Sequence, residues 1–368
     1  MRASSALLFC LLAISCNTPG PYVQFTKELD RHMNDLVGEN EPGGAVLVMK
    51  DSMVVFRQGY GIADLKTRDR ITPSTLFNLG SISKTFVANG ILILESQGKL
   101  SVEDSLIKYF PGFKNKDIAR KVKIKHLLTH TSGLPDNRPV SRDSVFYLTA
   151  DDAQNWYPVT QTDTLEFEPG TRYHYSNPAF NGLALIIEQV SGMKWQAFID
   201  KNIFKPSGMI NSTITDGAHP ESGVSHGYTR IAGEWKEDDY GEEPTFCAAG
   251  NGGVWSSIDE LAKYELALRS SAFLDRANVD SSRTVKQFPG WQDEKPPFIG
   301  WSWFIDLTPE GHQVISHTGH QGGYAAYYIS IPSKGILVVV LYNAPYDVYA
   351  FRADVLNLLS RNNWLDRS

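Results

Sequence analysis

Two residues that could form a catalytic pair, Ser81 and Lys84, stand three positions apart in the sequence. Side chains at this spacing share one face of a helix, so the lysine amine would lie beside the serine hydroxyl. A serine hydroxyl is a poor nucleophile until a nearby base takes its proton, and a buried lysine with a lowered pKa can be that base. The free N–H groups at a helix start would suit the oxyanion of a tetrahedral intermediate. The pair therefore indicates acyl transfer, although a capping serine and a surface lysine give the same spacing.

The residues that follow help to decide between these interpretations. The stretch 81–97 has the pattern of a long helix closed by Gly98. Apolar residues occupy much of its circumference: Phe86, Val87, Ile91, Leu92 and Leu94. A helix of this kind belongs to a protein core, and a lysine near its start fits a solvated surface charge poorly.

A second candidate group contains Tyr175 and Asn177, which flank one residue after a turn signal at 168–170. A phenol beside a lysine can act as an acid or a base. An amide can donate a hydrogen bond to a substrate carbonyl. Taken alone, Tyr175 could equally be a core residue with a satisfied hydroxyl group.

The third group is the run His317, Thr318, Gly319 and His320, which we expect at the end of a strand, before two further glycines. Glycine lets a backbone approach closely and leaves N–H groups free for a ligand. An ordinary turn at a strand end is the alternative.

In this order, the three groups resemble the serine β-lactamase and penicillin-binding-protein superfamily. In detail they are similar to its class C β-lactamase, D-alanyl-D-alanine carboxypeptidase and esterase branch. Flanking stretches share the resemblance, and it covers roughly residues 25–345. These stretches are residues 77–80, 124–135, 167–177 and 248–257.

The resemblance implies catalytic roles for three residues. Ser81 would be the nucleophile, and Lys84 would be its general base or would hold Tyr175 partly ionised. Tyr175 would pass the proton to the leaving group and activate the deacylating water. Which of Lys84 and Tyr175 takes the first proton stays open, because the two would titrate as a coupled pair.

The resemblance also implies the residues that bind substrate. Asn177 would bind the amide on the acyl side, and Thr318 and Gly319 would line the edge of the cleft. The backbone N–H groups of Ser81 and His320 would form the oxyanion hole.

His317 departs from the β-lactamase pattern, which usually has lysine there. Histidine at this place resembles the carboxypeptidase and esterase members, and makes efficient β-lactam hydrolysis doubtful. Since imidazole loses its charge across neutral pH, we expect His317 to attract substrate carboxylates only when protonated. The KM for carboxylate substrates would then rise above about pH 7.

These groups require a scaffold, and the sequence predicts one of the α/β (α+β) class. Strand patterns occur near both chain ends and helical patterns between them, so both ends should complete one antiparallel sheet, with flanking helices and an inserted, mostly helical region. We expect a single β-lactamase/transpeptidase-like domain over residues 22–362. The expected strands are residues 45–49, 54–56, 299–306, 313–317, 324–331 and 336–342, and the expected helices are residues 23–36, 81–97, 122–128, 181–190, 258–267 and 348–359.

The N-terminus and the overall charge concern location and partners. Residues 1–16 have a positive start, a short apolar run and Cys16, which resembles a bacterial lipoprotein signal with Cys16 as the lipidation site; a plain secretory signal is the alternative. Residues 17–21 would be a tether, so we expect an exported, periplasmic or cell-envelope protein held to a membrane by lipid. The net charge of −6 disfavours nucleic-acid partners.

The sequence also supports expectations about the substrate and about two alternative functions. The most favoured function is hydrolysis of a D-alanyl peptide or a D-amino-acid amide or ester, with weak β-lactamase activity and no cofactor. Loops at 136–164 and 213–243 should border the cleft, and the oligomeric state stays open. One rival is a penicillin-binding sensor that is acylated but not turned over. The other is a metallohydrolase through His126 and His130, disfavoured because residue 127 is leucine where the zinc motif needs glutamate.

Overall fold

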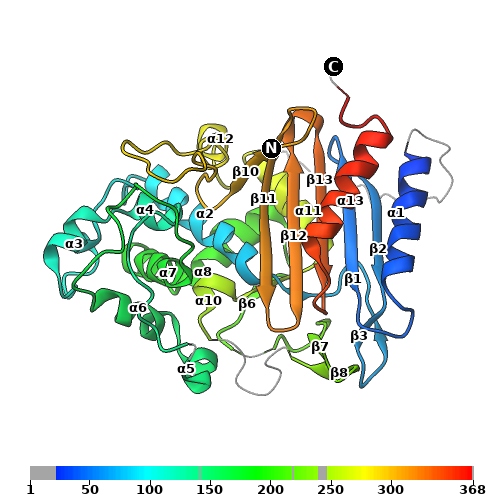
Figure 1. The fold of residues 1–368 in the computed structure, drawn as a ribbon, viewed down its shortest axis with the longest axis horizontal. Helices are drawn as coiled ribbons and strands as arrows, with labels where there is room; N and C mark the ends of the chain where they lie inside the picture. The colour runs from blue at the N-terminus through cyan, green and yellow to red at the C-terminus, as the bar shows by residue number, and fades with distance from the viewer. Residues whose placement is uncertain (1–21, 141, 218, 239–246, 367–368) are drawn as a thin grey trace, which may run out of the picture.

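The computed structural model describes residues 22–140, 142–217, 219–238 and 247–366. A six-stranded antiparallel sheet stands at its centre, in the order β10-β11-β12-β13-β1-β2 (Figure 1). Both chain ends supply strands, which confirms the predicted fold class. Its strands are β1 (Gly44–Lys50), β2 (Met53–Tyr60), β10 (Phe304–Leu307), β11 (Gln313–Gln321), β12 (Tyr324–Ile331) and β13 (Ile336–Tyr342).

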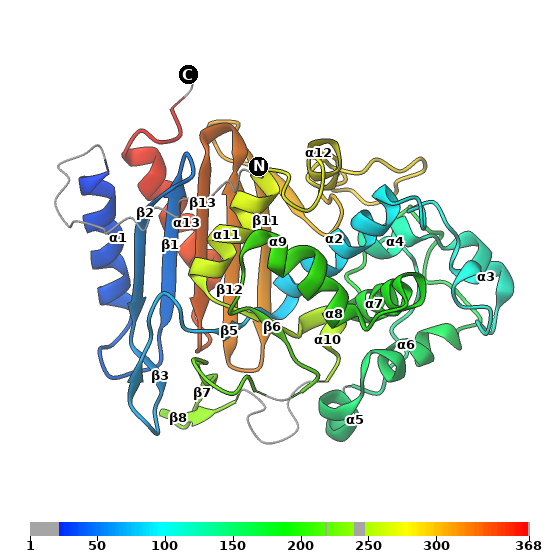
Figure 2. The same ribbon diagram turned by 180° about the vertical axis from the view of Figure 1, so that it is seen from behind.

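The interior strands are apolar because both of their faces are covered. Every residue of β12 and β13 is buried. α1 (Val23–Leu36) and α13 (Val348–Arg361) lie on one face of the sheet (Figure 1), and α11 (Ile258–Arg269) lies on the other (Figure 2). The continuous apolar pattern at 336–342 thus marked a strand buried on both faces, as predicted.

The inserted region packs against the edge of the sheet where β10 and β11 lie (Figure 2). At its centre is α2 (Ser83–Ser96), which is buried from its first residue to Leu94 and packs against α7 (Asn177–Ser191). One hydrophobic core joins Phe86 of α2 and Leu183 of α7 to Val339 of the sheet. This shared core fixes the start of α2 relative to β11, where the candidate site lies.

The remaining elements are short. Those of the inserted region are β5 (Phe77–Asn78), η1 (Gly80–Ile82), η2 (Leu106–Lys108), α3 (Lys116–Lys121), α4 (Ile124–Leu128), α5 (Ser144–Thr149), α6 (Asp152–Thr160), α8 (Trp195–Ile199), η3 (Asp200–Phe204), α9 (Lys205–Ser207), β6 (Thr213–Ile214), α10 (Ala249–Gly252), β9 (Val254–Ser256) and α12 (Arg276–Ser282). The others are β3 (Ile62–Asp64), β4 (Asp69–Arg70), β7 (Tyr228–Ile231), β8 (Glu234–Glu237) and η4 (Pro332–Lys334). Within the described ranges, no helix combines the length and the apolar character needed to cross a bilayer.

Several predicted boundaries were wrong: α7 begins at Asn177 and not at residue 181, and β2 extends over Met53–Tyr60 and not only 54–56. Two further differences concern the site. The strand expected at 299–306 begins only at Phe304, because Ser302 has a φ of 69° and the Trp301 N–H bonds to the carbonyl of Ser282 instead of to the sheet. The strand expected to end at His317 continues to Gln321, so the third candidate group lies inside β11.

Candidate active site

Ser81 and Lys84 meet at the junction of η1 and α2. Lys84 Nζ donates to Ser81 Oγ at 3.0 Å and to the carbonyl of Asn251 at 2.7 Å. Lys84 is fully buried, and this burial, with a contribution from the positive charge of Arg138, holds its pKa well below the ordinary value. A lysine in this setting favours the neutral amine, the form that can accept a proton.

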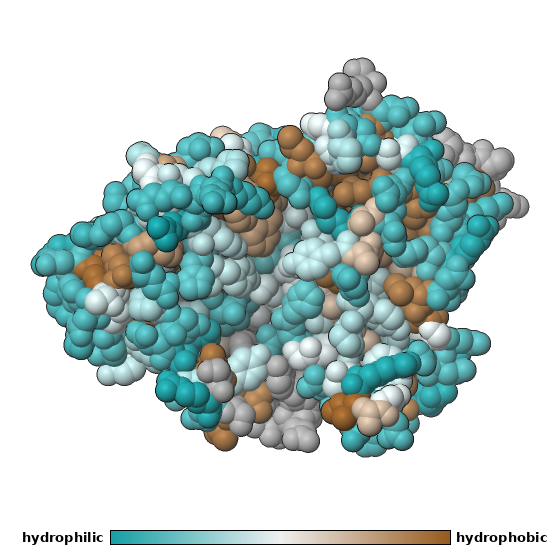
Figure 3. All heavy atoms as spheres, viewed as in Figure 1, coloured by the Kyte–Doolittle hydropathy of each residue, from teal (hydrophilic) through white to brown (hydrophobic). Residues whose placement is uncertain are grey.

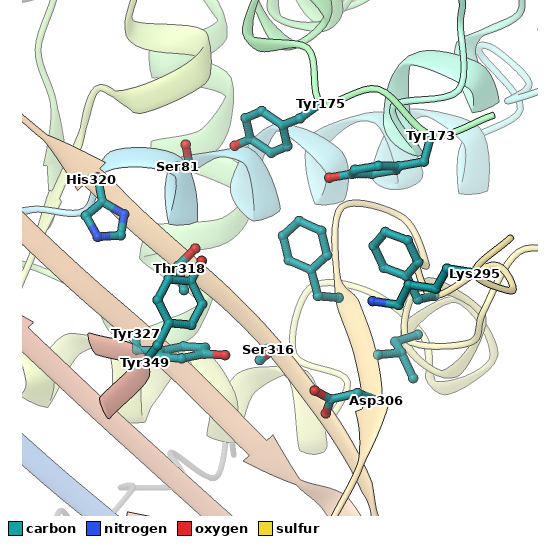
Figure 4. A pocket seen from close by; sticks show the side chains of 13 residues that line it. Ser81, Tyr173, Tyr175, Lys295, Asp306, Ser316, Thr318, His320, Tyr327 and Tyr349 are labelled. Atoms are coloured by element: carbon teal, nitrogen blue, oxygen red, sulfur yellow. The ribbon is translucent and has the colours of Figure 1, made fainter. Parts of the chain in front are cut away.

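Tyr175 completes the contacts around the serine hydroxyl. It precedes α7, and its hydroxyl group hydrogen-bonds the Ser81 side chain (Figure 4). Lys84 Nζ lies 5.2 Å from the centre of the Tyr175 ring. Burial raises the pKa of Tyr175 above its ordinary value, and the Ser81 hydrogen bond opposes this shift. Tyr175 is therefore a protonated phenol at neutral pH.

His130 holds the Tyr175 loop in place. Its ring stacks on the Tyr175 ring with the centroids 4.3 Å apart, and its Nδ1 accepts from the Ser176 N–H at 3.0 Å. The His130 carbonyl accepts from the His174 N–H at 2.9 Å. Burial, with Lys84 nearby, holds the pKa of His130 well below its ordinary value. His130 is thus a neutral support for Tyr175.

His126 lies apart from this arrangement. It is buried in the first turn of α4, where its Nδ1 accepts from the Lys123 N–H. Burial lowers its pKa to about 4. Within the described ranges, no three His, Cys, Asp or Glu side chains are grouped so that they could hold a metal ion.

The backbone of β11 touches the backbone of η1. A Cβ on Gly319 would lie 1.9 Å from the carbonyl oxygen of Leu79, and a Cβ on Gly80 would lie 2.6 Å from His320 N. Gly80 also has a φ of 50°. Because a side chain at either glycine would push the two elements apart, these glycines keep His320 N close to the Ser81 turn.

His317 is not the accessible, titratable group that the sequence analysis expected. Only 1% of it is exposed, and its Nδ1 donates to the carbonyl of Thr318 at 2.6 Å. Burial lowers its pKa to about 3, and Lys84 adds to the effect. His317 is therefore neutral at physiological pH, which contradicts the protonation on which the expected pH dependence of KM depended.

A cavity of about 600 Å³ opens beside Ser81. Figure 3 shows this face hollowed between the helical region and the sheet. Aromatic rings form much of the wall, and Thr318 and His320 of β11 contribute to it (Figure 4). The lining residues are Ser81, Tyr173, Tyr175, Lys295, Phe298, Phe304, Ile305, Asp306, Ser316, Thr318, His320, Tyr327 and Tyr349.

The lining differs from the sequence-based expectation. The described residues of the stretches 136–164 and 213–243 supply no lining residue, and the segment 295–306, which carries no motif, supplies five. Asn177 is half-buried at the start of α7 and is not part of the lining.

A buried carboxylate supports the site from behind. Asp152 Oδ1 accepts from Asn181 Nδ2 at 2.6 Å and from the Gly250 N–H at 2.9 Å, and its Oδ2 accepts from Trp195 Nε1 at 2.9 Å. Burial raises its pKa to about 7, although the hydrogen bonds from Gly250 and Asn181 oppose the shift.

This carboxylate is linked to Lys84 through two asparagines. Asn181 Oδ1 accepts from Asn251 Nδ2 at 3.1 Å, and the Asn251 carbonyl is the second acceptor of Lys84 Nζ. Asp152 and the two asparagines are buried. The network therefore fixes the carbonyl that orients the lysine amine toward Ser81.

Fold and site together define a class of protein. An antiparallel sheet with a helical region at its edge, and a Ser–Lys pair with a tyrosine where they meet, are the features of the serine β-lactamase and penicillin-binding-protein class.

The comparisons with known proteins agree. The beta-lactamase family model matches residues 29–361. A penicillin-binding protein of Bacillus subtilis is 27% identical over 325 residues, 82% of this chain and 68% of the relative. A putative D-alanyl-D-alanine carboxypeptidase of Escherichia coli K12 is 24% identical over 398 residues, 94% of this chain and 91% of the relative.

A solved structure has the same fold. The octameric penicillin-binding protein homologue from Pyrococcus abyssi superposes with a TM-score of 0.77 at 25% identity, over 93% of this chain and 77% of that chain. The chain belongs to the beta-lactamase family, a family of serine hydrolases.

Proposed function

We propose that this protein hydrolyses an amide or ester of a D-amino acid, most favourably a D-alanyl peptide, through an acyl-Ser81 intermediate. The observation that carries the proposal is the 3.0 Å hydrogen bond between Ser81 Oγ and the fully buried Lys84 amine. Among the relatives, one is named a putative D-alanyl-D-alanine carboxypeptidase, which supports this substrate class.

The pKa directions support an order of proton transfers. Lys84 Nζ, as the neutral amine, takes the Ser81 Oγ proton while Oγ bonds to the scissile carbonyl carbon. The oxyanion accepts from the backbone N–H groups of Ser81 and His320. Tyr175, a protonated phenol, donates its proton to the leaving nitrogen or oxygen as the scissile bond breaks, and the proton on Lys84 returns to the phenolate.

Deacylation repeats these steps with water. A water molecule attacks the acyl carbon and gives its proton to the Lys84–Tyr175 pair, Ser81 Oγ recovers a proton, and the acid product leaves. Asn177 would bind the acyl-side amide, and Thr318 and Gly319 would line the cleft edge. In this mechanism His317 stays neutral beneath the cleft and takes no proton.

A hydrolysis screen tests the proposal. Purified protein is assayed against D-alanyl-D-alanine peptides, D-amino-acid amides and esters, and a chromogenic cephalosporin. We expect multiple turnovers on a D-amino-acid substrate and at most slow turnover of the cephalosporin. A single burst of product equal to the enzyme concentration, with Ser81 left acylated, would instead identify a sensor that is not turned over.

The buried carboxylate behind Lys84 provides a prediction about positioning. We expect Asp152→Asn to lower kcat about tenfold with little change in KM, because an amide cannot accept all three hydrogen bonds and a small displacement of the Asn251 carbonyl misplaces the lysine amine. Inactivation of Ser81 by a fluorophosphonate, which needs the base but little of the cavity, should slow to the same extent.

Asp151→Asn is the matched control. Asp151 caps the same helix, α6, and asparagine caps a helix equally well. If folded Asp152→Asn enzyme keeps its wild-type kcat, or changes only in KM, Asp152 has no part in placing Lys84.

The location of the protein remains a separate proposal. Cys16 lies outside the described residues, and the support is its position after the apolar run 6–14. We propose that the exported protein is anchored in the cell envelope by lipid on Cys16. Cys16→Ser should release the protein from the membrane fraction or block its processing, measured by fractionation and by mass spectrometry of the mature N-terminus. A mature chain that starts beyond Cys16 would contradict this anchor.

A further inference from the structure

The cavity beside Ser81 has an uneven distribution of charge. Its charged lining groups, Lys295 and Asp306, lie on the side away from Ser81 (Figure 4). They have opposite signs, and Lys295 Nζ lies over the Phe298 ring, 4.1 Å from its centre. Nearer Ser81 the lining is uncharged, because burial lowers the pKa of His320 below its ordinary value. The lining therefore holds one carboxylate and one exposed ammonium, both on the side away from Ser81.

A further cation, Arg352, lies next to the cavity lining but already forms an ion pair. Arg352 of α13 donates from its guanidinium to Asp306 Oδ2 at 2.7 Å, and the arginine side chain is 23% exposed. Phe304 and Asp306 are two residues apart on β10 and share one face of the strand, and Asp306 lines the cavity whereas Arg352 is not among its lining residues. Asp306 thus neutralises the arginine that could otherwise bind a substrate carboxylate.

The position of Tyr175 indicates which part of the substrate the cavity binds. The proton that Tyr175 delivers must reach the leaving atom, so the leaving group lies on the Tyr175 side of Ser81. Tyr173 and Tyr175 line the cavity on this side (Figure 4), and Phe298 and Phe304 also belong to its lining. Besides Tyr175, five Phe and Tyr rings line it: Tyr173, Phe298, Phe304, Tyr327 and Tyr349.

We propose that this cavity is a leaving-group site for an uncharged aromatic or apolar group, and that Asp306 sets this specificity by neutralising Arg352. The proposal rests on the proposed acyl-Ser81 mechanism and narrows its substrate class. Leaving groups that end in an amide or ester are preferred over those with a free carboxylate, because among the described lining residues only the exposed Lys295 is a cation.

A matched pair of peptides tests the assignment. N-acetyl-D-alanyl-D-phenylalanine and its C-terminal amide differ only in the charge of the leaving group. We expect the wild-type kcat/KM to be about tenfold higher for the amide, because its neutral end needs no counter-ion. D-phenylalaninamide should also leave faster than D-alaninamide, because the aromatic rings pack against the larger group.

Variants of the ion pair test the role of Asp306. Asp306→Asn leaves Arg352 unpaired, and should raise kcat/KM for the free acid about tenfold relative to the amide. Adding Arg352→Gln to that variant should restore the wild-type preference. Asp280→Asn is the control, since Asp280 also pairs with an arginine, Arg276, at 2.9 Å but lies away from the cavity.

The outcomes distinguish a failure of the leaving-group assignment from a failure of the acyl-Ser81 mechanism. A wild-type enzyme that prefers the free acid, or a preference that Asp306→Asn leaves unchanged, overturns the leaving-group assignment while Ser81 chemistry stands. The leaving-group assignment alone is also overturned if Ser81 reacts with a fluorophosphonate but the enzyme does not hydrolyse the amide. If Ser81 does not react and no peptide is hydrolysed, the acyl-Ser81 mechanism itself fails.

Discussion

Replacement of Ser81 by alanine is expected to lower turnover by on the order of 10⁴-fold or more and to abolish covalent labelling by a fluorophosphonate. The hydroxyl oxygen is the atom that would bond to the acyl group. It accepts a hydrogen bond from Lys84, and the hydroxyl group also hydrogen-bonds Tyr175. No other described nucleophile lines the cavity with a base at hydrogen-bonding distance. The measurement is kcat/KM on the best substrate of the screen, together with the mass of the labelled protein.

Ser96→Ala is a suitable control for this variant. Ser96 ends α2, the helix that Ser81 precedes, and its hydroxyl group bonds to the carbonyl of Ile93. This variant should keep activity and labelling. Turnover above the uncatalysed rate in Ser81→Ala, or label at another residue, would show that Ser81 is not the nucleophile.

Lys84→Ala should be nearly as damaging, with a loss on the order of 10³-fold in kcat/KM, because residues that act as one unit are strongly non-additive. Burial holds the pKa of Lys84 well below its ordinary value, so the neutral amine is the form that works as base. The wild-type rate should therefore fall as pH drops through this lowered pKa. The residual activity of the variant should not show this fall at low pH. Lys121→Ala, at an exposed lysine paired with Glu168, is the control.

The same shift has a consequence for stability, for which Lys84→Met is the better variant. The unfolded chain carries a proton on this lysine at neutral pH, and the folded protein disfavours that proton. The free energy of unfolding should thus rise with pH between the lowered pKa and the ordinary value, and Lys84→Met should remove this rise. Thermal unfolding across pH measures it. An unchanged pH dependence in Lys84→Met would mean that the amine is charged in the folded state.

The sequence by itself determined the fold class and the identity of the central site residues. Ser81 and Lys84 are three residues apart where η1 continues directly into α2, so local helical geometry brings them together. The patterns at 23–36, 324–331 and 336–342 predicted α1, β12 and β13 to the residue, because each is long and bounded by strong turn or capping signals. The meeting of Tyr175 and β11 with Ser81 was implied by the order of motifs in a resembling family.

Only the tertiary structure decided the state of those residues and the shape of the cavity. His317 has the same sequence context whether it is exposed or buried, and it is packing against distant elements that removes it from water and keeps it neutral.

The cavity wall likewise joins Tyr173, the segment 295–306 and Tyr349, which are far apart in the chain. The pairing of Asp306 with Arg352 spans 46 residues and depends on how α13 lies on the sheet. Desolvation and long-range packing have no local sequence signal, and they set the charge and the specificity of this site.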